Sequence, residues 1–471
     1  MGKGVQLSEY QCMGSGATGR IYIGKLNGGK YAFKRRYLRS GKDYPTGCVY
    51  LCEIDAMCSF DHPNILRAIT MQTESPIKDN FRIDTQNPSG ETEEGKTYRA
   101  DPVYLISDAA ERDLSRYSLS NTGRIDKDNE SISGSGDNAK MVIRKIMWQV
   151  LDGVAYMHSL GRIHRDIKPG NVLLFEDKHV RICDFDMCTP DIPGFQLSKA
   201  MTPEYTPPEI LSQWADVLYN PKVDIWGAGH IMHDLVKGRP AISRGDLHGD
   251  SLDMYILSVQ KAIFPNGSYV DTMGRSIEPI DIETSLELGD PEMDDLLAHM
   301  LDCNPDTRWS AIECLNHSFF QGEPIPRYPS IADHTFERHH MTEEMATVFD
   351  EQIDGCSSYV PFFLGLDILM RVCATKPRSN TNMKNLAICC YNMGQKFFYA
   401  EHANCIKMDM ATAKRMEFSI IEKLKGRIYR RTIYSELQSN HMEIYKFLMA
   451  PDIFPCKFSS LLKEIKKQLP T

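Results

Sequence analysis

Glycines near the start of the chain are spaced for chemistry on a phosphate group. The segment 14–21 reads Gly-Ser-Gly-Ala-Thr-Gly-Arg-Ile. Glycine lets the backbone approach phosphate oxygens closely and point its N–H groups at them. Taken alone, this pattern is equally compatible with a plain glycine-rich hairpin. The phosphate-binding candidates are Gly14, Ser15, Gly16, Ala17, Thr18, Gly19 and Ile21.

A lysine and a glutamate follow at positions that would serve the same phosphates. Lys34 ends the segment Ala32-Phe33-Lys34, on a predicted strand over 30–36, where its ammonium group can reach phosphate oxygens. Glu53 belongs to a helix predicted over about 46–60, because apolar residues recur there at near-helical spacing. We therefore expect Lys34 and Glu53 to pair, although each on its own would be interpreted as a solvated surface charge.

The most specific pattern lies near the middle of the chain. Residues 164–171 read His-Arg-Asp-Ile-Lys-Pro-Gly-Asn, and Asp184-Phe185-Asp186 begins thirteen residues after Asn171. The order of these residues, after the glycine segment and Lys34, resembles eukaryotic-type protein kinases. Three further segments agree with this resemblance: Thr202–Glu209, Asp224–Gly229 and Asn304–Arg308.

The resemblance covers residues 1–321 and implies an α+β, bilobal protein kinase fold. A β-rich N-lobe is expected over 1–110 and a helical C-lobe over 111–321. Polar stretches at 71–100 and 115–140 are predicted to be loop insertions.

The resemblance also implies roles for single residues, because phosphoryl transfer needs positioning and charge neutralisation. Asp166 would accept the proton of the substrate hydroxyl, and Lys168 would stabilise charge on the γ-phosphoryl group. Asn171 and Asp184 would hold Mg²⁺. Ala32, Asp108 and Ala110 would line the ATP site, the last two in the hinge. Lys168, two positions after Asp166, is typical of Ser/Thr kinases.

The activation segment carries candidates for regulation. Thr202 and Glu209 belong to its end, where Arg308 would pair with Glu209. Ser198, four residues before Thr202, is a candidate phosphorylation site whose phosphate would bind Arg165. Asp186 stands where the family has glycine, and we expect it to restrict backbone flipping of the preceding Asp-Phe pair.

The C-terminal part has a helical pattern throughout. Helices are predicted over 341–352, 360–375, 381–399 and 410–425, after a proline-containing linker at 322–339. Residues 340–471 resemble a cyclin box, which implies an all-α cyclin-like bundle. By that resemblance, Lys396 and Glu417 would face the kinase beside its regulatory helix. An all-α bundle without this role is the alternative.

The amino-acid composition limits the classes of partner that we expect for this protein. The net charge of −9 argues against a dominant nucleic-acid surface, and no apolar run is long enough for a membrane helix. The 14 cysteines show no zinc-type pairing, and the N-terminus lacks a signal peptide, which favours the cytoplasm or nucleus.

We therefore expect an ATP- and Mg²⁺-dependent Ser/Thr protein kinase of cyclin-dependent-kinase type. Its partners would be a protein substrate with a Ser or Thr acceptor and, within the chain, its own cyclin-like domain, which would activate it in cis. The alternative is a weakly catalytic pseudokinase that acts as a scaffold.

Overall fold

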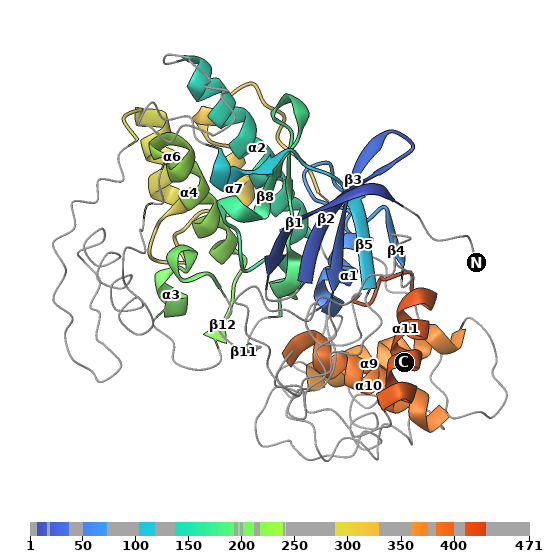
Figure 1. The fold of residues 1–471 in the computed structure, drawn as a ribbon. Coiled ribbons are helices and arrows are strands. Elements are labelled where there is room, and N and C mark those ends of the chain that lie inside the picture. Colours follow the sequence, from blue (N-terminus) through green and yellow to red (C-terminus); the bar gives the residue numbers. More distant parts are fainter. Residues whose placement is uncertain are drawn as a thin grey trace, which may run out of the picture. The chain divides into compact units, whose positions relative to one another are not determined.

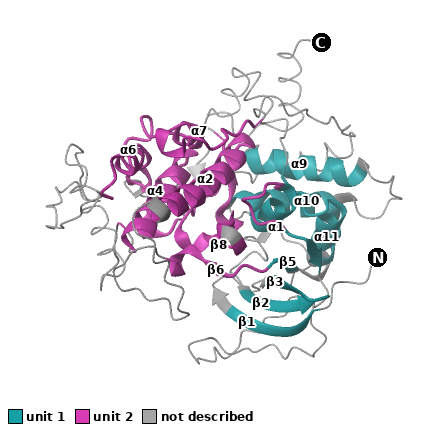
Figure 2. Ribbon diagram, turned by 90° about the horizontal axis from the view of Figure 1, so that it is seen from above, with its two compact units in different colours: residues 1–59, 68–108, 332–471 teal, residues 60–67, 109–331 magenta. Residues whose placement is uncertain are grey.

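The computed structural model groups the chain into two compact units (Figure 2). Unit 1 contains Met1–Ser59, Ala68–Asp108 and Ala332–Thr471, and unit 2 contains Phe60–Arg67 and Ala109–Ile331. The boundary at 108/109 coincides with the predicted hinge. The structure describes residues 7–16, 19–36, 50–72, 103–117, 137–192, 196–197, 201–211, 217–238, 241, 288–328, 359–374, 383–399 and 410–429.

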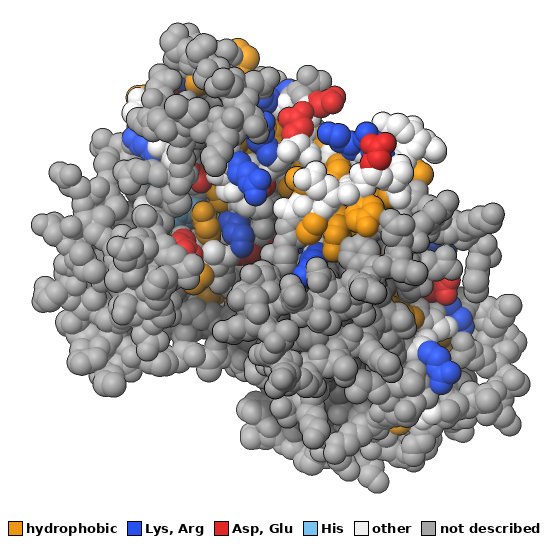
Figure 3. All heavy atoms as spheres, viewed as in Figure 1, with side chains coloured by type: hydrophobic (Ala, Val, Ile, Leu, Met, Phe, Trp, Pro, Cys, Tyr) orange, Lys and Arg blue, Asp and Glu red, His pale blue; other side chains and the backbone are white. Residues whose placement is uncertain are grey.

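Unit 1 is built on an antiparallel sheet with the strand order β1-β2-β3-β5-β4 (Figure 1). The strands are β1 (Ser8–Gly16), β2 (Gly19–Leu26), β3 (Gly29–Arg36), β4 (Thr70–Gln72) and β5 (Val103–Asp108). Because side chains alternate between the faces of a strand, one face collects a buried cluster of Leu7, Tyr22, Phe33, Tyr104 and Ile106. From the side shown in Figure 3, hydrophobic side chains gather over the strands of this sheet, and both signs of charge lie beside them.

Helix α1 (Tyr50–Ser59) is buried on all sides over most of its length. Residues 51–57 are all buried, including Glu53 and Asp55, which are 1% and 0% exposed. A helix that is buried all round must be covered on every side. The predicted helix over 46–60 is thus present at its C-terminal half, and residues 37–49 lie outside the described residues.

The C-terminal helices of unit 1 are α9 (Tyr359–Ala374), α10 (Met383–Tyr399) and α11 (Met410–Lys423). Helices α9 and α10 touch closely: a Cβ at Gly394 would lie 2.2 Å from the carbonyl oxygen of Pro361. Three of the four predicted helices agree with these bounds, and the one predicted over 341–352 lies outside the described residues.

Unit 2 is mainly helical. Its α-helices are α2 (Asp137–Ser159), α3 (Pro208–Leu211), α4 (Lys222–Lys237), α6 (Pro291–Met300) and α7 (Ala311–Leu315). Short strands form three small sheets: β6 (Arg112–Asp113), β8 (Val172–Leu174) and β9 (Val180–Ile182); β7 (Arg162–Ile163) and β10 (Thr189–Pro190); β11 (Gln196–Leu197) and β12 (Val217–Leu218). The 3₁₀ helices are η1 (Leu114–Arg116), η2 (Pro169–Asn171), η3 (Glu176–Lys178), η4 (Phe185–Met187), η5 (Pro203–Tyr205) and η6 (Ser318–Phe320).

Helix α2 shows the spacing of apolar residues that is typical of a helix packed on a core. Its apolar residues at 143, 146, 150, 154 and 157 are all buried. The helix begins at Asp137, however, so the end of the polar stretch predicted over 115–140 is helical. None of the helices that the structure describes is long and apolar enough to cross a membrane.

Candidate active site

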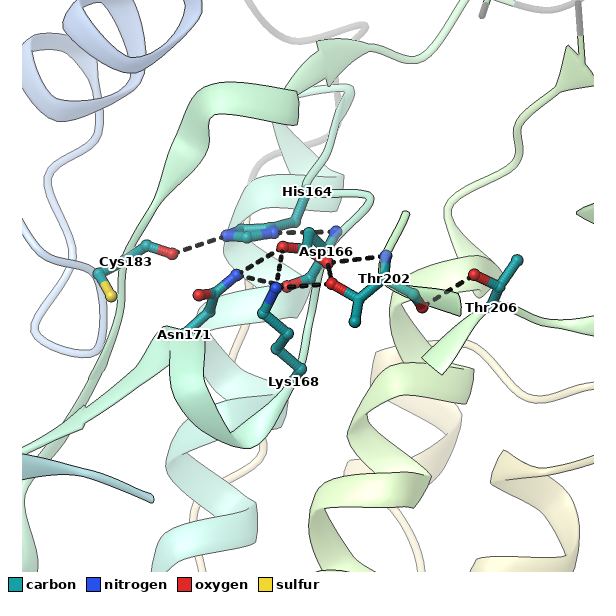
Figure 4. A network of polar contacts seen from close by, with 7 residues as sticks. All are labelled: His164, Asp166, Lys168, Asn171, Cys183, Thr202 and Thr206. Carbon is teal, nitrogen blue, oxygen red and sulfur yellow. Dashed lines mark hydrogen bonds and ion pairs between the residues drawn. The ribbon is translucent and has the colours of Figure 1, made fainter. Parts of the chain in front are cut away.

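In unit 2, the carboxylate of Asp166 is the centre of a polar network (Figure 4). Its Oδ2 accepts hydrogen bonds from Lys168 Nζ at 2.6 Å and from Asn171 Nδ2 at 2.9 Å. Its Oδ1 accepts from the Thr202 hydroxyl at 2.7 Å and from the Thr202 N–H at 3.2 Å. Lys168 also donates to the Thr202 hydroxyl, at 2.6 Å. The structure thus brings four predicted site residues together.

Asp224, in the first turn of α4, holds the loop that carries Asp166. Its carboxylate is fully buried and accepts the backbone N–H groups of His164 and Arg165, each at 2.9 Å. The His158 ring nitrogen lies 2.9 Å from the same carboxylate. Arg165 has a positive φ of 66°, a conformation that costs free energy for a residue with a side chain. The bonds to Asp224 stabilise this backbone conformation.

His164 connects the loop of Asp166 to the strand that precedes Asp184. Its Nδ1 accepts the Asp166 N–H at 3.2 Å, so Nε2 carries the proton and donates to the Cys183 carbonyl oxygen at 3.0 Å. The Cys183 N–H in turn donates to the Asn171 carbonyl oxygen at 2.9 Å. These bonds place Asp184 beside Asn171.

Asn171 and Asp184 form a donor set that suits Mg²⁺. The Asn171 amide nitrogen donates to Asp166, so its amide oxygen points away from that carboxylate. Asp184 adds a carboxylate and has a left-handed backbone with φ 65°. Hard oxygen ligands are those that Mg²⁺ prefers. The residues present therefore fit the metal that the sequence predicts.

A second anchor fixes the end of the activation segment. Arg308 is fully buried and binds Glu209 with two parallel hydrogen bonds, Nη1 to Oε1 at 2.7 Å and Nη2 to Oε2 at 2.9 Å. Such a bidentate pair restrains both partners. Thr206 donates to the Thr202 carbonyl oxygen at 2.9 Å, which ties this segment to Asp166 through Thr202.

In unit 1, Lys34 and Glu53 are brought together as predicted. Lys34 Nζ lies 2.7 Å from Glu53 Oε1, and the Glu53 side chain is 2% exposed. Lys34 stands opposite Ile21 of β2 and Leu105 of β5, on the face of the sheet opposite Phe33. The pair thus ties Lys34 of β3 to Glu53 of α1, which fixes the position of the lysine on this face of the sheet.

The remaining nucleotide-site candidates are divided between the units. Gly14, Ser15 and Gly16 end β1, Gly19 and Ile21 lie in β2, and Ala32 lies in β3, whereas Ala17 and Thr18 lie outside the described residues. Asp108 is the last residue of β5 in unit 1, and Ala110 belongs to unit 2. Ser198 lies outside the described residues.

Two residues with special roles in the sequence analysis occupy definite positions. Asp186 lies inside the 3₁₀ helix η4, and the positive φ belongs to Asp184. The Cβ of Asp186 is therefore accommodated without backbone strain. Arg165 donates from Nε to the Met187 carbonyl oxygen at 2.6 Å, and its guanidinium lies 4.8 Å from the Tyr219 ring centre.

In the C-terminal helices, Lys396 and Glu417 pair with each other. Lys396 Nζ lies 2.8 Å from Glu417 Oε2, and both side chains are under a tenth exposed. The structure thus places both residues as an ion pair between α10 and α11. Their predicted role at an interface with the kinase stays a prediction.

Sequence reasoning did not single out two polar residues, the buried Asp55 and the half-buried Tyr328. Asp55, on α1, accepts the Tyr429 N–H at 2.8 Å. Tyr328, in the predicted linker, donates to Asp152 and lies 2.7 Å from His62 Nε2. The sequence carries no specific signal for either residue, because Asp55 shares its helix with Glu53 and Tyr328 stands among prolines.

Comparison with known proteins assigns the family. The protein kinase domain family matches residues 7–320, two thirds of the chain, and the chain therefore belongs to the protein kinase family. Two similar proteins are mitogen-activated protein kinases. The chain is 30% identical to Sty1 of Schizosaccharomyces pombe over 206 residues, which is 41% of this chain and 57% of Sty1. It is 30% identical to HOG1 of Saccharomyces cerevisiae over 210 residues, 42% of this chain and 47% of HOG1.

The chain spans about half the length of these curated relatives. At the level of the family, the predictions of a Ser/Thr protein kinase and of ATP with Mg²⁺ as its cofactors are confirmed. The strand-rich and helical parts of residues 7–320 fit the α+β kinase fold. The likeness to cyclin-dependent kinases and to a cyclin box stays a prediction.

Proposed function

We propose that this chain transfers the γ-phosphoryl group of ATP to Ser or Thr hydroxyls of a protein substrate. The observation that carries the proposal is the Asp166 carboxylate, held by Lys168, Asn171 and Thr202 at hydrogen-bond distances. A carboxylate so fixed can orient a hydroxyl and accept its proton, and this positioning is a large part of phosphoryl-transfer catalysis.

Each neighbour of Asp166 has a distinct task in this proposal. Lys168 carries positive charge to the oxygens of the transferred group. Asn171 and Asp184 would hold Mg²⁺, which when bound neutralises phosphate charge. Lys34, oriented by Glu53, would bind the phosphates of ATP in unit 1. The Thr202 hydroxyl is hydrogen-bonded to both Asp166 and Lys168, so it sets the distance between the carboxylate and the ammonium group.

The first test removes the proposed base. Asp166→Asn should lower phosphotransfer to a protein substrate by at least ~10³-fold, because a positioned proton acceptor is lost. Asp306→Asn makes the same chemical change at an exposed aspartate and should leave the rate unchanged. If the parent chain shows no transfer above the Asp166→Asn variant, the scaffold alternative replaces the enzyme.

We further propose that the chain is cyclin-dependent-kinase-like and that residues 340–471 activate it in cis. Support comes from unit 1, where α1 carries Glu53 and is buried against the C-terminal helices. A kinase needs its Lys–Glu pair in place, so a domain that holds α1 also holds this pair. Because the activator is tethered, its effective concentration would be near millimolar.

The cis proposal has its own test. Lys396→Ala combined with Glu417→Ala should lower the rate of the full chain without unfolding the kinase. An unchanged rate would remove these two residues from the interface. We also propose a cytoplasmic or nuclear location, which the scattered cysteines, without zinc-type pairing, favour.

A further inference from the structure

The side of α1 opposite Glu53 carries a buried acid. Asp55 follows Glu53 by two residues, about 200° further round the helix, so the two carboxylates face opposite sides. Asp55 is 0% exposed. Charged residues are almost never fully buried unless they are paired. The side of α1 that carries Asp55 therefore requires a hydrogen-bond donor from whatever covers it.

The shorter of two hydrogen bonds to Asp55 comes from the backbone that follows α11, and the longer one, at 3.3 Å, comes from the Ser59 hydroxyl of α1 itself. The Tyr429 N–H donates to Asp55 Oδ1 at 2.8 Å. One turn before Asp55, the Cys52 thiol donates to the Phe397 carbonyl oxygen at 3.2 Å. The rings of Phe397 and Tyr429 stack with centres 5.7 Å apart. Two segments of the C-terminal part thus meet on one face of α1 (Figure 2).

Gly426 allows the backbone after α11 to lie close to α1. Gly426 has φ 76°, and a Cβ built on it would lie 2.5 Å from Cys58 Sγ and 3.2 Å from Ile54. Any side chain at this position would both strain the backbone and push the segment off the helix. The segment 426–429 is therefore shaped to lie directly on α1.

An ion pair inside the C-terminal helices holds this segment in place. Arg371 of α9 donates to the carbonyl oxygens of Arg427, at 2.7 Å, and Ile428. Arg371 also lies 2.7 Å from Asp367, whose side chain is 3% exposed. The two carbonyls directly precede the Tyr429 N–H. The orientation of that N–H toward Asp55 is thus set from within α9.

We propose that Asp55 is a positioning residue: it recognises the Tyr429 N–H and anchors segment 426–429 to α1, which keeps Glu53 turned toward Lys34. The interaction surface consists of Cys52, Asp55 and Cys58 on α1, with Phe397, Gly426 and Tyr429 as its partner. The proposal rests on the proposed kinase and deepens its activation in cis. A carboxylate left without this donor would be a buried charge with a lost partner, so α1 would move to hydrate it.

The test uses the full chain and two readouts. In Asp55→Ala, hydrogen exchange of the Tyr429 amide should become at least about tenfold faster, because its acceptor is gone. The value of kcat/KM for phosphotransfer should fall about tenfold, with a raised KM for ATP, since Lys34 loses its partner. Asp55→Asn keeps an acceptor oxygen and should recover part of both losses.

Two variants make the result specific. Asp61→Ala makes the same change as Asp55→Ala at an exposed aspartate just after α1 and should alter neither readout. Arg371→Met should reproduce both effects from the other side of the contact. The Asp55→Ala/Arg371→Met double variant should then be no worse than the more affected single variant.

The outcomes separate this proposal from the proposed function. Unchanged exchange at Tyr429 in Asp55→Ala overturns the anchor. Faster exchange with an unchanged kcat/KM and KM overturns the positioning role. If the parent chain transfers no phosphate above Asp166→Asn, the proposed function fails, while the exchange experiment still decides whether Asp55 anchors the segment.

Discussion

Two buried aspartates, one in each unit, each bind backbone N–H groups. Their partners lie at very different distances along the chain. In unit 2, Asp224 is 0% exposed and accepts the N–H groups of His164 and Arg165, 60 and 59 residues away. In unit 1, Asp55 is 0% exposed and accepts the Tyr429 N–H, 374 residues away. Both fix a backbone segment through a charge-assisted hydrogen bond. The first shapes a loop that carries chemistry, and the second joins a helix to a domain.

The two aspartates differ in how strongly the bound segment depends on them. Asp224 satisfies two adjacent N–H groups and the His158 ring, so three donors lose their acceptor if it is removed. Asp55 holds a segment that Arg371 also holds. Removing Asp224 should therefore disrupt more structure than removing Asp55.

The largest effect is expected from Asp224→Ala. The three orphaned donors and the positive φ of Arg165 should cost about 4 kcal/mol of unfolding free energy, in the range for a broken buried charge network. Phosphotransfer should fall with it, because Asp166 lies next to Arg165. Chemical denaturation and initial rates measure the two effects, with Asp306→Ala as the exposed control. If this variant is as stable as the parent, Asp224 does not anchor the loop.

A smaller effect is expected from Lys396→Met in unit 1. It leaves Glu417 buried without its ammonium partner and should cost about 3 kcal/mol. The Lys396→Met/Glu417→Met double variant should recover most of that loss, since it removes the stranded charge as well. Thermal unfolding of the three variants measures the coupling. Additive losses would show that the two side chains contribute independently.

A third prediction concerns the loss of stability at low pH, because unit 2 contains a buried histidine. Burial lowers the pKa of His230 to about 3, and its ring lies 5.6 Å from that of Tyr205. The unfolded chain binds a proton near pH 6.5 and the folded chain does not, so stability is present above that pH and is lost as pH falls. At pH 5 the loss should be about 2 kcal/mol. In His230→Leu, stability should fall less between pH 7 and 5, and an identical slope would contradict the assignment.

The residues around Asp166 were predicted through the resemblance to protein kinases, which the pattern over 164–171 carries. Asp166, Lys168 and Asn171 lie within six residues of one another, on a loop that Asp224 holds. The helical pattern also gave the existence and approximate bounds of α9, α10 and α11. Local pattern was sufficient wherever the contact is local.

Asp55 could not be predicted in the same way. An aspartate on a helix is usually solvated, and nothing near it in the chain indicates burial. Its partner in the C-terminal part is a backbone N–H, which every residue except proline carries, so the sequence holds no specific signal for this contact. Only the packing of residues 426–429 on α1 distinguishes this aspartate from a surface charge. Tyr328 could not be predicted for another reason: its side-chain partners, on α2 and in the loop that follows α1, lie 176 and 266 residues away in the chain.

The smallest effect is expected from Tyr328→Phe. The Tyr328 hydroxyl donates to Asp152 and lies 2.7 Å from His62 Nε2, and burial with the Asp152 charge raises the pKa of this tyrosine. Trp148 donates to the Pro324 carbonyl oxygen at 3.2 Å, so the segment 324–328 is tied to unit 2 at two points. His62 also lies 3.3 Å from Asp152, so this carboxylate keeps a partner when the hydroxyl is removed. The loss should therefore be about 1 kcal/mol of unfolding free energy, the value of one hydrogen bond, with a rate within twofold of the parent. Tyr10→Phe, at an exposed tyrosine of β1, is the matched control for chemical denaturation. A loss as large as that of Asp224→Ala would mean that this hydroxyl, and not only the aspartates, organises its unit.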